Sequence, residues 1–110
     1  IAPLDALNKK WGDLTIGVGT KAIENADEAG AASVDYLMFS GYACLAYFWA
    51  KAAVTARAAL DMGSSEQEFY EAKIATARFY YQRILPRTHA CEAAILSGAE
   101  NLMSLPEQAF

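Results

Sequence analysis

The sequence predicts an all-α protein, an antiparallel up-and-down bundle of three long helices. Apolar residues recur at alternating spacings of three and four, which is the period of one face of an α-helix. Alanine, the strongest helix former, occupies 23 of the 110 positions. The two-residue alternation of a strand is missing, as are Asn-Gly and Asp-Gly hairpin turns. A chain of 110 residues suits a single domain, 1–110.

The first helix is predicted to begin near Pro3, because a proline in the first turn loses no helical hydrogen bond. We expect it to end at Gly30 and to be the least stable helix, since Gly12, Gly17 and Gly19 lie inside it. Its predicted buried face carries Leu4, Leu7, Trp11, Leu14 and Val18.

The second helix is predicted from about Ala32 to Asp61, with Gly63 as the left-handed residue that follows it. Its first half is apolar almost all round, so we expect it to be covered on more than one side. Gly41 lies on its predicted buried stripe, where a missing side chain lets another helix approach closely. That stripe comprises Val34, Leu37, Gly41, Cys44, Leu45, Phe48, Ala52, Thr55 and Ala59.

The third helix is predicted to start at a capping box formed by Ser65 and Glu68. Pro86 interrupts it, yet the apolar stripe continues in phase, which favours one helix kinked near Pro86 over two helices joined by a tight turn. The second alternative makes a four-helix bundle. Pro106 is the expected end, and Ala77 and Gly98 are expected at close helix crossings. The stripe comprises Tyr70, Ile74, Ala77, Tyr81, Ile84, Thr88, Cys91, Ile95, Gly98, Leu102 and Leu105.

Charge and composition exclude several functions. The net charge of −4 argues against nucleic acid as a partner, although basic residues alternate with aromatic residues in the third helix. We interpret that mixture as a docking surface. The uncharged run 36–50 is shorter than the roughly 20 residues of a membrane span, so we predict a buried helix and no transmembrane segment. The basic residues are Lys73, Arg78, Arg83 and Arg87, among Phe69, Tyr70, Phe79, Tyr80 and Tyr81.

Groups that could carry chemistry are sparse. The single histidine, His89, has Glu92 three residues after it, and one such pair cannot supply a di-iron or zinc site. The two cysteines, Cys44 and Cys91, favour a reduced, cytoplasmic protein over a disulfide framework. We therefore assign no catalytic, cofactor-binding or metal-binding residue. Because the chain begins at Ile1, we expect a fragment of a longer protein.

Several runs resemble the acyl-CoA dehydrogenase C-terminal-like domain, as appended to 3-methylmercaptopropionyl-CoA dehydrogenases and related bacterial enzymes. The resemblance covers residues 34–110 well and residues 1–33 only loosely. The similar segments are 41–42, 47–49, 52–53, 69–73, 77–80 and 84–86, followed by Gly98, Leu102 and Phe110.

The resemblance implies a parent flavoprotein of bacterial fatty acid metabolism that oxidises an acyl-CoA to its trans-2-enoyl form. FAD takes the hydride, a glutamate removes the α-proton, and an electron-transfer flavoprotein reoxidises the flavin. Those sites belong to the upstream body, so we expect this fragment to bind no FAD. We predict instead that it docks onto the dehydrogenase body or its dimer mate through Phe48, Trp49, Phe79 and Tyr80. A free-standing interaction bundle and a small helical enzyme remain as alternatives, which the intact mass of the natural product would test.

Overall fold

The structure is a computed structural model that describes residues 2–110, with side chains from Pro3 onward. Its long helices are α1 (Ala2–Glu24) and α2 (Asp27–Asp61), followed by a third unit that joins α3 (Gln67–Phe79) to α4 (Thr88–Leu96). Residues 2–110 contain no strand. The predicted all-α bundle of three long helices, with the third kinked, is confirmed.

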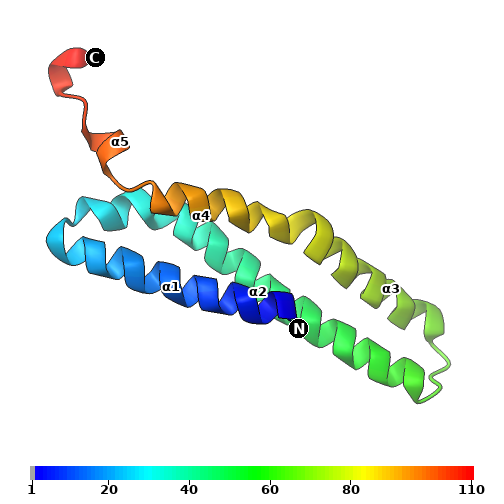
Figure 1. Cartoon of the computed structure of the whole chain (residues 1–110). Helices are drawn as coiled ribbons and strands as arrows, with labels where there is room; N and C mark the ends of the chain where they lie inside the picture. Colours follow the sequence, from blue (N-terminus) through cyan, green and yellow to red (C-terminus); the bar gives the residue numbers. More distant parts are fainter. Residues whose placement is uncertain (1) are drawn as a thin grey trace.

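Helix α2 is the centre of the arrangement, because α1, α3 and α4 all pack against it. The molecule is long and narrow, with principal extents of 68 × 27 × 15 Å. Helix α1 starts beside the middle of α2 and runs toward one end only (Figure 1). One half of the molecule is therefore a three-helix bundle, whereas the other half is a hairpin of α2 and α3.

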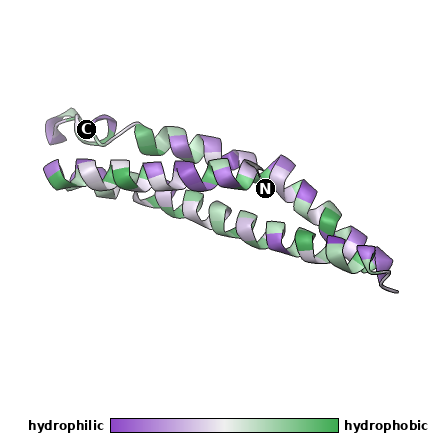
Figure 2. Ribbon diagram, turned by 60° about the horizontal axis from the view of Figure 1, so that its bottom comes forward, coloured by the Kyte–Doolittle hydropathy of each residue, from purple (hydrophilic) through white to green (hydrophobic). Residues whose placement is uncertain are grey.

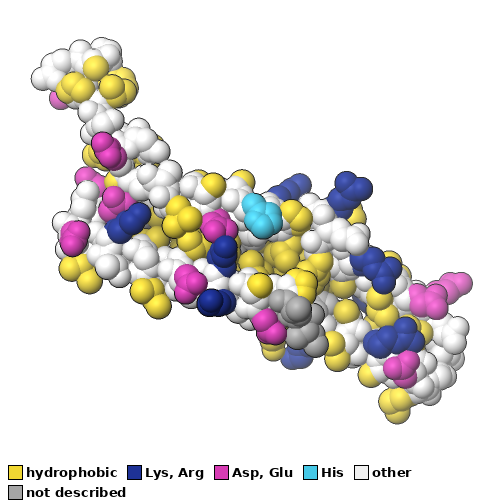
Figure 3. Space-filling view, in the orientation of Figure 1, with side chains coloured by type: hydrophobic (Ala, Val, Ile, Leu, Met, Phe, Trp, Pro, Cys, Tyr) yellow, Lys and Arg dark blue, Asp and Glu magenta, His cyan; other side chains and the backbone are white. Residues whose placement is uncertain are grey.

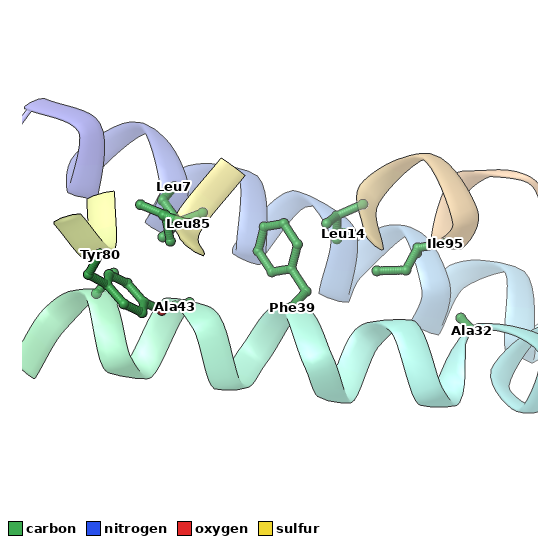
Figure 4. Close-up of a cluster of buried hydrophobic side chains, with 9 residues drawn as sticks. Leu7, Leu14, Ala32, Phe39, Ala43, Tyr80, Leu85 and Ile95 are labelled. Carbon is green, nitrogen blue, oxygen red and sulfur yellow. The ribbon is translucent and has the colours of Figure 1, made fainter. Parts of the chain in front are cut away.

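The core lies in the three-helix half and is centred on Phe39, which is 1% exposed. In Figure 4, Leu7 of α1 and Leu85 of the third unit lie on one side of Phe39, and Leu14 of α1 and Ile95 of α4 lie on the other. Leu7, Leu14 and Ile95 lie on the predicted stripes of the first and third helices, whereas Leu85 is a core residue that those stripes did not include. Alanines of α2 complete the cluster, and small residues of this kind allow helix axes to approach toward the lower end of the usual 8–10 Å.

Polar pairs join α1 to its neighbours. The Trp11 indole N–H donates to the Ser40 hydroxyl at 2.9 Å, and the hydroxyls of Thr15 and Tyr36 lie 2.6 Å apart. On the other side of α1, the Lys10 ammonium lies 3.0 Å from a carboxylate oxygen of Glu92 on α4. The polar atoms of α2 thus select which of its faces α1 covers.

The predicted end of the first helix at Gly30 is wrong. Helix α1 ends at Glu24 and α2 begins at Asp27, so Gly30 lies inside α2. The turn forms earlier because the Asn25 side-chain oxygen accepts the Asp27 N–H at 3.1 Å. Asp27 and Glu28 then occupy the first turn, where the helix dipole favours negative charge.

The turn between α2 and α3 agrees with the prediction at the end of α2 but not at the start of α3. Gly63 has a φ of +76°, and the N–H groups of Gly63 and Ser64 reach the carbonyls of Leu60 and Ala59. This is the hydrogen-bond pattern of a Schellman motif. The capping box predicted from Ser65 and Glu68 is wrong: α3 begins at Gln67, and the Ser64 hydroxyl accepts the Glu66 N–H at 3.1 Å instead.

The kink near Pro86 consists of two opposite distortions. A π-helical turn spans Tyr80–Ile84, and a 3₁₀ turn spans Leu85–Arg87. The first lengthens the backbone hydrogen bonds to i→i+5, and the second shortens them to i→i+3, so the residues beyond keep their helical phase. Thr88 and Ile95 accordingly stay buried on the predicted stripe.

The third unit ends ten residues before Pro106, which corrects the predicted boundary. Helix α4 stops at Leu96, and Gly98 adopts a φ of +78°. A carboxylate oxygen of Glu28 accepts the Ala99 N–H at 3.1 Å and holds the chain there. Gly98 thus ends a helix rather than marking a helix crossing. Beyond it, α5 (Glu100–Met103) and the turn Glu107–Ala109 extend away from the bundle (Figure 1), and Leu102 and Leu105 are exposed.

Helix α2 carries mostly apolar and weakly polar residues through its middle (Figure 2). By length and composition alone, this one helix of the described chain could cross a membrane. Only 17% of its most apolar window is buried inside the bundle, so the buried helix predicted for residues 36–50 is covered on one face only.

Candidate interaction surface

Helix α2 has two apolar faces, and the bundle covers one of them. The covered face is lined by small residues around Phe39. On the opposite side, Val34 is 70% exposed, Leu37 is 69% exposed and Phe48 is 60% exposed. We define the outer face of α2 as Val34, Leu37, Met38, Gly41, Cys44, Leu45 and Phe48, all of which are exposed.

The outer face corrects the stripe predicted for the second helix. Val34, Leu37 and Phe48 follow the expected helical spacing, but they face away from α1 and α4. The buried stripe is instead Ala32, Phe39, Ala43, Ala46 and Ala56. Hydropathy predicts burial of the stripe with the larger side chains. In the folded bundle the alanine stripe is buried instead, because its small side chains let the neighbouring helices come close.

Charged residues are missing from the outer face between Val34 and Phe48. Its members follow one another at intervals of 3, 1, 3, 3, 1 and 3 residues, so that Gly41 lies at the centre of a symmetric pattern. Contiguous apolar surface of this kind usually marks an interaction site.

The four residues predicted for docking have different environments. Phe48 and Phe79 are exposed, with 60% and 56% of their surface accessible. Trp49 is half-buried and packs against the core. Tyr80 is only 5% exposed, so its assignment to the docking surface is wrong. Its buried position follows from helical spacing, because Tyr80 lies three residues after the buried Ala77 and so shares its face.

Tyr80 and Tyr81 fasten the kinked segment to α2. The Tyr80 hydroxyl donates to the carbonyl of Tyr42 at 2.7 Å, and the Tyr81 hydroxyl donates to the carbonyl of Ala46 at 2.6 Å. Burial raises the pKa of Tyr80 to about 12, with smaller contributions from Tyr42, Tyr81 and Cys44. Burial also raises the pKa of Tyr81. Both hydroxyls therefore stay protonated donors at neutral pH.

A groove of about 510 Å³ lies between the start of α1 and the kink. Its walls are mostly apolar and include Leu7, Phe39 and Leu85. Lys10 and Glu92 line it and are paired with each other, and the single histidine, His89, lies beside them (Figure 3, cyan). Over residues 2–110, no three His, Cys, Asp or Glu side chains gather as a metal site would require.

The family described as "Acetyl-CoA dehydrogenase C-terminal like" matches residues 1–106. The chain belongs to this family. The match includes the first helix, for which the sequence resemblance was loose.

One curated relative in this family context is the broad-specificity linear acyl-CoA dehydrogenase FadE5 of Mycobacterium tuberculosis (strain ATCC 25618 / H37Rv). It is 34% identical over 85 residues, which are 76% of this chain. The matched region is 14% of the relative's own length. The family domain is thus a small part of the enzyme that it resembles.

Six of the seven outer-face residues were not predicted as surface: Val34, Leu37, Met38, Gly41, Cys44 and Leu45. For all of them except Val34, the signal was the uncharged run between Asp35 and Lys51, which is apolar almost all round the helix. Such a run needs cover on two sides, and the neighbouring helices of this chain cover one. Because one side of the helix is left uncovered, it forms an apolar face on the outside of the bundle.

Proposed function

We propose that this chain is the C-terminal accessory domain of an FAD-dependent acyl-CoA dehydrogenase and that its role is structural. The observation that carries the proposal is the outer face of α2, where Leu37 and Phe48 are mostly exposed although the helix is central. Membership of the family supports a dehydrogenase as the parent. The outer face docks onto the remainder of the enzyme or onto a second subunit and stabilises the assembly.

The chemistry of the parent is then the oxidation of an acyl-CoA to a trans-2-enoyl-CoA in the cytoplasm, with electrons passed from FAD to an electron-transfer flavoprotein. The groove of this chain does not fit the flavin dinucleotide. A pyrophosphate needs free cations or converging backbone N–H groups, whereas Lys10 in the groove is paired with Glu92 at 3.0 Å. We therefore place FAD and acyl-CoA in the dehydrogenase body and assign no catalytic step to this chain.

The test is to delete residues 1–110 from the enzyme that carries them and to measure oligomer mass, thermal midpoint and turnover together. A structural role predicts a smaller or less stable assembly, with turnover falling only as the enzyme unfolds or dissociates. An equally stable assembly that had lost acyl-CoA binding would contradict the proposal, because the domain would then form part of the substrate site.

A further inference from the structure

We propose that the outer face of α2 pairs with the same face of a second copy of this chain, in antiparallel orientation about Gly41. This inference rests on the proposed structural role and names the partner. Three observations support it: the symmetric spacing of the face, the small residue at its centre, and the charges at its two ends.

The spacing makes the face self-complementary. With a two-fold axis at Gly41, Val34 of one copy lies level with Phe48 of the other, and Leu37 lies level with Leu45. The same patch then meets itself, which is the requirement for a two-fold interface. Gly41 has open space around the position of a Cβ atom, so it lets the two helices approach closely at the axis.

The ends of the face carry opposite charges. Asp27 is exposed two helical turns before Val34 on the same face of α2, whereas Lys51 and Lys73 are exposed beside Phe48. In the part of the chain that the structure describes, none of these three belongs to a salt bridge. In an antiparallel pair, the acidic end of each copy lies beside the basic end of the other, so the favourable contact occurs twice. A parallel partner would place like charges together.

The distances along the helices agree with this pairing. Lys51 lies ten residues after Gly41, and Asp27 lies fourteen residues before it. In the antiparallel pair, Lys51 of one copy and Asp27 of the other are therefore offset by ~6 Å along the helix axes, which is within the reach of a lysine side chain. A hollow of about 350 Å³ beside Phe48 is lined by Ala52, Thr55, Phe69 and Tyr70. It lies where the beginning of the partner's α2 would pack.

The first test is the mass of the chain by light scattering over a dilution series. The dimer has twice the chain mass of 11.9 kDa, and we expect the double variant Leu37→Glu/Leu45→Glu to return it to the monomer. Ile16→Glu is the matched control, because Ile16 on α1 is as exposed as Leu37 (70% and 69%). Circular dichroism confirms that each variant is folded. A wild-type chain that stays monomeric throughout would overturn the pairing.

The second test is disulfide trapping in a Cys44→Ala/Cys91→Ala background. Gly41→Cys places two thiols at the axis, so mild oxidation should give a covalent dimer. Gly12→Cys is the control, because Gly12 is also helical with open space around its Cβ position. Val34→Cys separates antiparallel from parallel pairing: antiparallel copies hold these thiols ~21 Å apart, beyond the reach of a disulfide. Cross-linking of Val34→Cys and not of Gly41→Cys would contradict the proposed geometry.

The two proposals can fail separately. A monomeric chain, in an enzyme whose assembly is lost when residues 1–110 are deleted, overturns the α2 pairing and supports docking onto the dehydrogenase body. A dimeric chain whose deletion leaves the enzyme unchanged supports the pairing and overturns the structural role. Binding of a monomeric chain to neutral phosphatidylcholine vesicles, lost in Leu37→Glu/Leu45→Glu, would assign the face to a membrane and overturn the pairing.

Discussion

At the scale of single residues, Tyr80 shows how a polar atom decides the direction of an aromatic side chain. Its ring is buried, and its hydroxyl finds a partner in the carbonyl of Tyr42. Tyr80 and Tyr81 lie three and four residues after the buried Ala77, so helical spacing allows either of them on the buried face. Of these two, the predicted stripe contains Tyr81 alone, because periodicity does not distinguish two adjacent aromatic residues.

Replacing Tyr80 with Phe should lower the free energy of unfolding by about 1 kcal/mol at neutral pH, because the buried hydrogen bond to Tyr42 is lost. Urea unfolding measures the change. Tyr47→Phe is the matched control, since Tyr47 is exposed and should leave the free energy unchanged. Equal losses in the two variants would contradict the role of the Tyr80 hydroxyl.

The same residue predicts a pH dependence. Burial raises the pKa of Tyr80 from 10.0 to about 12, so as pH rises the unfolded chain loses this proton before the folded chain does. The contribution to stability is complete below pH 10 and is lost between pH 10 and about 12. The free-energy difference between wild type and Tyr80→Phe should therefore shrink over that interval. A difference that stays constant there would contradict the assigned burial.

Replacing Gly98 or Gly12 with alanine should change the free energy of unfolding in opposite directions. Gly98 has a φ of +78°, where an L-residue is strained, so Gly98→Ala should destabilise the chain by about 1–2 kcal/mol. Gly12 lies inside α1 with open space around it, so Gly12→Ala should stabilise by about 0.5–1 kcal/mol. Thermal unfolding measures both. A stabilising Gly98→Ala would show that α4 continues past this position.

At the scale of helices, the apolar periodicity correctly predicts that the helices exist and how their residues are spaced along a face. It misplaces the residues at which the helices begin and end. The stripe across Pro86 predicts a kinked helix because residues on both sides share one face. The α1–α2 turn was misplaced because a side-chain hydrogen bond from Asn25 decides it, whereas Gly30 is accommodated inside a helix. The buried face of α2 could not be chosen from sequence, because both of its stripes are apolar.

The contact between α2 and α3 is tested by Ala77, which is buried on α3. Ala77→Leu adds volume at a packed position and should lower the free energy of unfolding by about 1–3 kcal/mol. Ala72 lies on the same helix and is exposed, so Ala72→Leu serves as the control and should change little. Thermal melts that moved equally in both variants would contradict the assignment of the buried stripe.

At the scale of the whole molecule, the shape and the charge distribution agree with a domain that packs against another protein surface. The chain is 68 Å long but only 15 Å thick, so much of its apolar surface stays outside. Basic side chains follow α3 and the kink on the face shown in Figure 3, and acidic side chains lie at both ends of the bundle, near the α1–α2 turn and α5 and around the α2–α3 turn. Of the four residues predicted for docking, Phe48 and Phe79 are exposed, Trp49 is half-buried and Tyr80 is buried, so exposure separates residues that the sequence pattern grouped together.

We propose that the outer face of α2 stabilises the assembly of a dehydrogenase. The most direct measurement compares the full enzyme with its Leu37→Glu/Leu45→Glu variant for oligomer mass and thermal midpoint, with turnover measured at a temperature where both are folded. Ile16→Glu is the control of equal exposure. We predict a lower mass or midpoint for the double variant alone, with turnover per folded subunit retained. An unchanged mass and midpoint would contradict the account.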